Sequence, residues 1–360
     1  MALDQTSLAA ILDALNGLEE SEKMKLSEAI FLEAFKAENI KNTHTTLGGI
    51  HSGNKVPVLG DEDGFDGFPF VDGCALPDCS IANDWSTMKW ELGEIGCELT
   101  LCLKDLLPKF QAFYNVYRKM NEGDINSAFV QFIAERFQTK HLKAELRVAY
   151  FADVDATDTK LNGYDGFVSQ MDAISTANPD LRVDITENAQ TTLAGQTIAD
   201  GQAVYDYMKE LYNQIAGKAW FNPEKMVWRM NRSLVNKLVA LLNTKSDLSG
   251  ISCGCIDPEK AAGARIFSYD NLTLFGIPVE PKPFEQAMKS SAFYWDGSKF
   301  TKYKNIIILA RRDAMVLGYE TEEALSQFNI GYDKRKREVW MQGSSLFGAA
   351  VPVPYFGIAI

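Results

Sequence analysis

The cysteines are the first residues of this chain that could bind a metal or form disulfides. The six cysteines form three close pairs, Cys74 and Cys79, Cys97 and Cys102, and Cys253 and Cys255. Their C-x4-C and C-x-C spacings differ from the C-x2-C pattern of structural zinc sites, and no histidine lies close to any pair. If Cys97 and Cys102 share one strand, their odd separation places them on opposite faces. We therefore expect reduced thiols rather than a zinc site or disulfides.

Two acidic clusters partly resemble calcium-binding loops. In Asp61-Glu62-Asp63, the loop would need Asp or Asn where Phe65 stands. Asp153, Asp155 and Asp158 form the second cluster, which lacks the required glycine and distal glutamate. We interpret both clusters as solvated loop acids and predict no metal site.

Catalytic motifs are absent from the sequence. The three histidines, His44, His51 and His141, are far apart and show no His-x-x-x-His spacing. There is no nucleophile elbow, phosphate-binding P-loop or dinucleotide-binding glycine motif. No carboxylate pair is marked out by its context. We predict no catalytic and no cofactor-binding residues, and a structural rather than an enzymatic protein.

Composition indicates a folded, acidic protein. Of 360 residues, 46% are hydrophobic and 23% charged, and the net charge is −12. Residues 1–180 hold 15 Lys and Arg against 29 Asp and Glu, whereas residues 181–360 hold 21 against 19. The acidic first half is therefore not expected to bind nucleic acid, because phosphate binding needs clustered cations.

No targeting or membrane segment is predicted. The N-terminus has no basic region before its apolar residues, as a secretory signal would have. Residues 339–360 are uncharged, but glycines and prolines interrupt them too often for a spanning helix. We interpret them as buried strands, and expect a soluble protein made in a cytoplasm with no membrane contact.

A long amphipathic helix is predicted over residues 124–149, and the rest of the chain is arranged around it. Its apolar residues recur at spacings of three and four, at Ile125, Phe129, Phe132/Ile133, Phe137, Ala144 and Val148. Its remaining surface is expected to carry the charges, namely Glu135, Arg136, Lys140, Lys143 and Glu145. Gly123-Asp124 offers an N-cap. A helix of this length spans about 40 Å, but taken alone it also suits many α/β or α+β cores.

The other predicted elements give a mixed α and β architecture. Residues 4–40 are expected to form a helical hairpin, 42–100 a glycine-rich β segment with strands at 55–59, 68–71 and 88–103, and 106–120 a helix. Residues 201–242 predict helix, strand and helix, with strand 226–230 and Asn231 as the cap of the second helix. Further strands are predicted at 271–279 and 303–309. The basic run Lys334-Arg335-Lys336-Arg337 favours a solvated hairpin end or an ion-pair patch over nucleic-acid contact.

In this order the elements resemble the major capsid proteins of tailed bacteriophages, which have the Hong Kong 97-type fold. Three stretches carry the resemblance. Residues 124–155, continuing into Leu161-Asn162-Gly163, look like the family's spine helix and its exit. MVWRMNRSLVNKLVALL, residues 226–242, is similar to its strand followed by an asparagine-started helix, and NLTLFGIPVEP, residues 271–281, to its strand after a small loop.

The resemblance implies an α+β capsid fold in five parts. These are an N-terminal helical arm at 1–45, an extended loop at 46–103, a peripheral domain at 104–195 with the spine helix 124–149, an axial domain at 196–330, and C-terminal strands at 331–360 that return to the peripheral domain. Some family members lose an N-terminal segment to a protease, whereas a retained arm is expected here. No residue matches the family's lysine–asparagine cross-link.

As function, the resemblance implies a shell subunit that forms hexamers and pentamers of an icosahedral capsid. Portal, scaffolding and decoration proteins would be its partners, and packaged double-stranded DNA would be enclosed without sequence-specific contact. The expected location is the virion capsid, after synthesis in the host cytoplasm. Two alternatives stay open: an encapsulin-like nanocompartment with the same shell fold, and a soluble enzyme with an unrecognised site.

Overall fold

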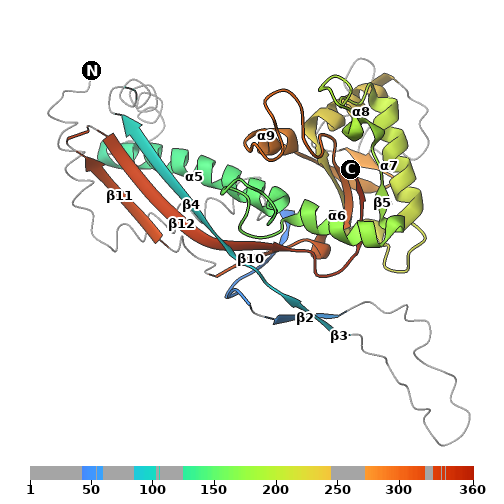
Figure 1. Ribbon diagram of the computed structural model, residues 1–360, viewed down its shortest axis with the longest axis horizontal. Helices are drawn as coiled ribbons and strands as arrows, with labels where there is room; N and C mark the ends of the chain where they lie inside the picture. Colours follow the sequence, from blue (N-terminus) through green and yellow to red (C-terminus); the bar gives the residue numbers. More distant parts are fainter. Residues whose placement is uncertain are drawn as a thin grey trace, which may run out of the picture. The chain divides into compact units, whose positions relative to one another are not determined.

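The computed structural model describes residues 43–53, 55–59, 85–102, 105, 125–244, 272–320, 327–333, 335–336 and 338–360. The chain divides into two compact units. Unit 1 comprises Met1–His51, Glu91–Val148 and Leu317–Gly348, and unit 2 comprises Ser52–Trp90, Ala149–Val316 and Ala349–Ile360. The fold class is α+β, as predicted (Figure 1).

A five-stranded sheet forms most of the described part of unit 1. Its strands are β1 (Thr45–Leu47), β4 (Gly93–Cys102), β10 (Val316–Tyr319), β11 (Gln327–Asp333) and β12 (Glu338–Ala350). The order is β1-β10-β12-β11, with β4 also paired to β12. Both β4 and β11 are antiparallel to β12, so β12 lies between two strands from distant parts of the chain. Alternate residues of β12, including Val339, Met341 and Phe347, are buried.

The long helix is α5 (Ile125–Phe151), which confirms the helix predicted over residues 124–149. Phe132, Phe137 and Val148 are buried, as their spacing predicts. Its last residues, Ala149–Phe151, belong to unit 2, where the Tyr150 and Phe151 rings pack on Phe284 at centroid distances of 4.7 and 5.5 Å. Aromatic packing of this kind anchors the end of the helix.

Unit 2 is built on a six-stranded sheet in the order β5-β13-β9-β6-β8-β7. The strands are β5 (Arg182–Val183), β6 (Met226–Asn231), β7 (Thr273–Leu274), β8 (Ile277–Lys282), β9 (Ile307–Arg311) and β13 (Phe356–Ala359). The helices are α6 (Phe167–Ala177), α7 (Gly201–Ile215), α8 (Arg232–Thr244) and α9 (Phe284–Lys289), with 3-10 turns at Pro179–Leu181, Thr186–Ala189, Pro223–Lys225 and Arg312–Ala314. A separate pair, β2 (Lys55–Leu59) and β3 (Trp85–Lys89), is antiparallel.

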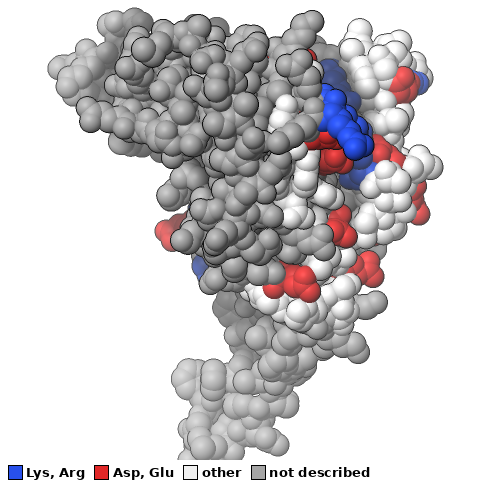
Figure 2. All heavy atoms as spheres, turned by 90° about the vertical axis from the view of Figure 1, so that its left-hand side faces the viewer, with Lys and Arg blue, Asp and Glu red and all other residues white. Residues whose placement is uncertain are grey.

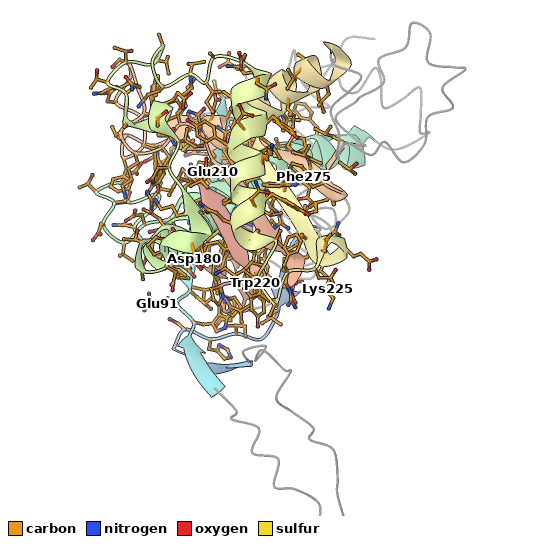
Figure 3. All side chains as sticks on the ribbon, turned by 90° about the vertical axis from the view of Figure 1, so that its right-hand side faces the viewer. Glu91, Asp180, Glu210, Trp220, Lys225 and Phe275 are labelled. Atoms are coloured by element: carbon orange, nitrogen blue, oxygen red, sulfur yellow. The ribbon has the colours of Figure 1, made fainter. Side chains whose placement is uncertain are left out.

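Helix α7 packs on both α8 and the sheet, as Figure 3 shows. Its predicted apolar face is confirmed, because Val204, Met208, Leu211 and Ile215 are all buried. A Cβ on Gly357 of β13 would lie 2.9 Å from Cδ1 of Leu211. Glycine at this position therefore lets the helix approach the strand closely.

Three strand predictions need correction. The strand predicted over 88–103 is two strands, β3 and β4, interrupted where the Trp90 carbonyl accepts a hydrogen bond from Gly53. The strand predicted over 271–279 is a hairpin, because Phe275 and Gly276 both adopt positive φ, of 55° and 77°, between β7 and β8. The strand predicted over 303–309 begins at Ile307 and continues to Arg311.

The remaining element predictions are confirmed or lie outside the described residues. The strands predicted at 55–59 and 226–230 are β2 and β6, and 339–360 contains β12 and β13. The helical hairpin at 4–40, the strand at 68–71, the helix at 106–120, the N-cap at 123–124 and the cluster at 61–63 lie outside the described residues. So do Cys74, Cys79, Cys253 and Cys255.

Candidate assembly surfaces

The three histidines have different surroundings, and each has its own partner. His44 is buried, and its Nδ1 lies 2.9 Å from the Thr43 hydroxyl. His51 is exposed, and its Nδ1 lies 3.2 Å from the Glu320 carboxylate. His141 is buried within α5. Across the described residues, no group of three or more His, Cys, Asp or Glu side chains is placed to hold a metal ion.

A buried ionisable pair lies on α5. His141 Nε2 is 3.2 Å from Glu145 Oε1, one helical turn further on, and the two side chains are 3% and 0% exposed. Phe137 stacks against the His141 ring with centroids 6.1 Å apart. The prediction that Glu145 lies on the helix surface is therefore wrong, because a neighbouring polar group allows this carboxylate to be buried. The four-residue spacing of the two side chains is the sequence signal for this pair.

Two of the three aspartates of the 153–158 segment have side-chain partners, and the third, Asp155, is exposed. Asp153 is buried, and its carboxylate accepts a hydrogen bond from the Asp155 amide at 3.0 Å and pairs with Lys302 Nζ at 2.7 Å. Asp158 accepts a hydrogen bond from the Ser291 hydroxyl at 2.7 Å. The prediction of solvated acids is wrong for Asp153, whose charge Lys302 balances.

A charged cross-strand pair that the sequence analysis did not identify joins β6 to β8, with its arginine buried and its glutamate partly exposed. Arg229 lies opposite Glu280 in the register, and its Nε is 3.3 Å from Glu280 Oε2. Lys282 Nζ lies 3.1 Å from the same oxygen, and Arg229 also donates to Met315 Sδ at 3.1 Å. Burial raises the pKa of the Tyr150 hydroxyl, and the Arg229 charge opposes this rise. A lone arginine within the apolar run MVWRM is the signal that points to a buried partner.

Amide side chains hold the segment that precedes β9. Asn188 Oδ1 accepts a hydrogen bond from the Lys304 amide at 3.1 Å, and Gln196 both donates to and accepts from the Phe300 backbone. Asn231 was expected to cap α8; its side chain donates to the Lys304 carbonyl at 2.6 Å. Because these bonds satisfy backbone groups, they explain why β9 starts only at Ile307.

Half-buried aromatic rings lie beside α7 in unit 2. Tyr212 of α7 stacks on Phe275 with centroids 4.5 Å apart, and Trp220 stacks on Tyr355 at 5.4 Å. The Arg311 guanidinium lies 4.5 Å from the Tyr355 ring centre. Figure 3 shows Phe275 beside α7 and Trp220 below its end. Aromatic and arginine side chains are enriched in protein interfaces, so this face is one candidate assembly surface.

The outer face of the five-stranded sheet is the second candidate surface. On β4, the exposed residues are Glu94, Gly96, Glu98, Thr100 and Cys102, which alternate with buried Ile95 and Leu99. Thr100 lies opposite Trp340, and Trp340 lies opposite Gly331. A Cβ on Gly331 would lie 2.7 Å from the Trp340 ring, so glycine leaves room for that ring over the sheet. Cys97 and Cys102 share β4, and Cys102 is an exposed free thiol.

The basic run forms the end of a hairpin, as predicted. It connects β11 to β12, and Arg335 and Lys336 are exposed. Asp333 Oδ1 accepts hydrogen bonds from the Arg335 and Lys336 amides at 2.8 and 3.2 Å. These backbone hydrogen bonds lower the Asp333 pKa.

Charges of both signs lie beside one another on the described part of the face drawn in Figure 2. This mixture differs from the single-sign basic surface that binds nucleic acid. No helix in the described part of the chain has the length and apolar character needed to cross a membrane.

Comparisons with known proteins found similarity only among solved structures. No protein-family model and no curated protein matches the chain. A satellite phage P4 procapsid that includes the size determination protein has a chain 10% identical, with 92% of this chain and 98% of that chain covered and a TM-score of 0.49. The capsid of cyanophage Pam1 is 15% identical, with coverages of 90% and 91% and a TM-score of 0.45.

The capsid of a native GTA particle is 13% identical, covers 89% of each chain and has a TM-score of 0.40. Because these TM-scores are below 0.5 and the identities are low, the function inferred for this chain rests on its own elements.

Proposed function

We propose that this chain is the major capsid protein of a tailed bacteriophage, with the Hong Kong 97-type fold. It would assemble into hexamers and pentamers of an icosahedral shell around double-stranded DNA. One observation carries this proposal: the three stretches behind the family resemblance form helix α5, strand β6 with helix α8, and the β7–β8 hairpin, in the expected order. The third stretch differs in detail, because it forms two strands where one was predicted.

The division into parts is proposed on the same basis. The arm at 1–45 and the loop at 46–103 would reach neighbouring copies. The peripheral part was expected at 104–195 and 331–360, and unit 1 contains 104–148 and 331–348 of it. The axial part was expected at 196–330, and unit 2 contains 196–316 of it. The six-stranded sheet also takes β5 and β13 from segments assigned to the peripheral part, so the sheet delimits the axial part better than residue ranges do.

The acidic balance fits a structural role around DNA. A net charge of −12 repels phosphate rather than gripping it, so enclosed DNA would be held without sequence-specific contact. Portal, scaffolding and decoration proteins would be further partners. We place the protein in the virion capsid after synthesis in the host cytoplasm, and assign it no catalytic residue and no cofactor.

Light scattering coupled to size-exclusion chromatography tests the proposal, followed by analysis of the contents of the particles. We expect particles of many copies, and nuclease-protected DNA in particles recovered from infected cells. Shells that enclose a protein cargo and no DNA would support the encapsulin-like alternative. A mass of one chain at every concentration would contradict a shell subunit.

A further inference from the structure

Strand β4 presents one edge that no described strand covers. It pairs with β12 along its whole length, from Gly93 to Cys102, and no other pairing involves it among the described residues. The exposed carboxylates of Glu94 and Glu98 project on the same face, because side chains alternate along a strand. They are about 13 Å apart at the usual rise per residue. This edge is therefore an extended acidic row beside backbone groups that pair with no other strand in the described part of the chain.

The opposite charge is concentrated at the β11–β12 turn of the same sheet. Its sequence Lys334-Arg335-Lys336-Arg337 places four cations between Asp333 and Glu338. Asp333 accepts hydrogen bonds from the Arg335 and Lys336 amides, and both residues are exposed to solvent. Backbone atoms that are already hydrogen-bonded lose less entropy on binding than free ones do.

The turn cannot reach the acidic row of its own chain. Glu98 lies opposite Gln342, which is four residues along β12 from Glu338. That separation is about 14 Å before the turn begins, and Glu94 is further still. The two charged features therefore lie at different places on one sheet, and only a second copy can bring them together.

We propose that Arg335 and Lys336, in the β11–β12 turn of one copy, dock on the Glu94 and Glu98 edge of β4 in a second copy of this chain. The turn and the edge are different surfaces, so the contact is heterologous. The first copy keeps its β4 edge free and the second copy keeps its turn free, so each can bind a further copy. Repeated contacts of this type build rings and larger arrays. The inference rests on the proposed shell function and deepens it, because a shell explains why many copies meet. The contact itself requires only two copies.

Charge reversal with rescue tests the electrostatic part. The paired substitutions Arg335→Glu and Lys336→Glu should weaken association by about tenfold or more, because the turn loses its net positive charge and two carboxylates replace the cations that face Glu94 and Glu98. Glu94→Lys with Glu98→Lys should have the same effect. Mixing the two reversed chains should restore association to near the wild-type level. Lys140→Glu with Lys143→Glu, two exposed cations of α5 outside both candidate surfaces, is the matched control and should leave association unchanged.

Disulfide trapping tests the geometry. A tagged chain carrying Glu98→Cys is mixed with an untagged chain carrying Arg335→Cys, both in a Cys102→Ser background, since Cys102 is exposed and lies opposite Glu338. Mild oxidation should produce tagged–untagged dimers. Replacing Arg335→Cys by Lys143→Cys, an exposed position on α5, should remove them. Thermal unfolding of each variant checks that the fold is retained.

The outcomes separate this contact from the shell function. Trapped dimers and charge rescue without shells would support the contact and contradict the shell function. Shells that form equally well with either reversed pair, with no trapped dimer, would overturn the contact and leave the shell function standing. If the charge reversals weaken association and mixing the two reversed chains does not restore it, the contact is also overturned, because two matched surfaces must restore each other.

Discussion

Gly201, the first residue of α7, shows how closely two elements of unit 2 approach. An added Cβ would lie 2.3 Å from the Lys237 carbonyl oxygen of α8 and 2.7 Å from Leu241 Cβ. Gly201→Ala should therefore lower the free energy of unfolding by about 1–3 kcal/mol, measured by urea denaturation. Gly217→Ala is the control, since nothing lies within 4 Å of its added Cβ. Equal effects of the two substitutions would show that the close contact does not limit stability.

The Arg311–Asp313 ion pair predicts a dependence of stability on pH. Burial raises the pKa of Asp313, but hydrogen bonds and charge from Arg311 outweigh this and lower it below 3.8. A carboxyl with a lowered folded pKa stabilises the protein above the unfolded pKa, and the effect is lost as pH falls through the folded pKa. Asp313→Asn should cost about 0.5–1 kcal/mol at pH 7, because the pair is partly exposed.

The effect of the same substitution should shrink as the pH falls through the folded pKa of Asp313, because the wild-type carboxyl then becomes protonated. Denaturation of both proteins between pH 2 and 7 measures the difference. A difference that stays constant over this range would exclude ionisation of Asp313 as its cause.

Individual charged residues were the hardest to place from sequence. Glu145, Asp153 and Arg229 are all buried, although their charge favours the surface. Each has a compensating partner. The partner of Asp153 is Lys302, more than a hundred residues away in the chain, and the partner of Arg229 is Glu280, about fifty residues away. Local spacing carries no information about such distant partners, so only the His141–Glu145 pair was within reach of pattern analysis.

At the level of elements, hydrophobic periodicity was a good guide and turn chemistry was not. Helices α5 and α7 have the faces that their spacing predicts. The β7–β8 hairpin was missed because Phe-Gly is not a usual turn dipeptide. Phe275 adopts a positive φ that costs about 1–2 kcal/mol, and its stacking on Tyr212 offsets part of that cost.

The N-cap of α7 gives a prediction for an element. Asp200 accepts a hydrogen bond at 3.0 Å from the Ala203 amide, one of the otherwise unsatisfied donors of the helix. Asp200→Ala should destabilise the protein by about 0.5–2 kcal/mol in thermal or urea unfolding. Glu210→Ala, on the exposed side of the same helix, serves as the control and should change stability by less than about 0.5 kcal/mol. If both substitutions cost the same, the cap does not stabilise α7.

At the scale of the whole molecule, the fold class and the order of elements could be predicted, and the pairing of strands could not. Strand β12 lies between β4 and β11, and β13 between β5 and β9. Apart from the β11–β12 hairpin, these pairings join strands that are far apart in the sequence. Alternation of apolar residues indicates which face is buried but not which strand lies alongside. The uncovered edge of β4 and the basic turn became visible as matching surfaces only once this sheet order was known.

The central claim is that copies of this chain build a closed shell, and negative-stain electron microscopy of the purified protein tests it most directly. The account predicts closed shells or rings of five and six copies. It also predicts that high salt or the Arg335→Glu and Lys336→Glu substitutions reduce their number, because screening weakens exposed charge contacts. A uniform field of single copies, unchanged at high concentration and low salt, would contradict it.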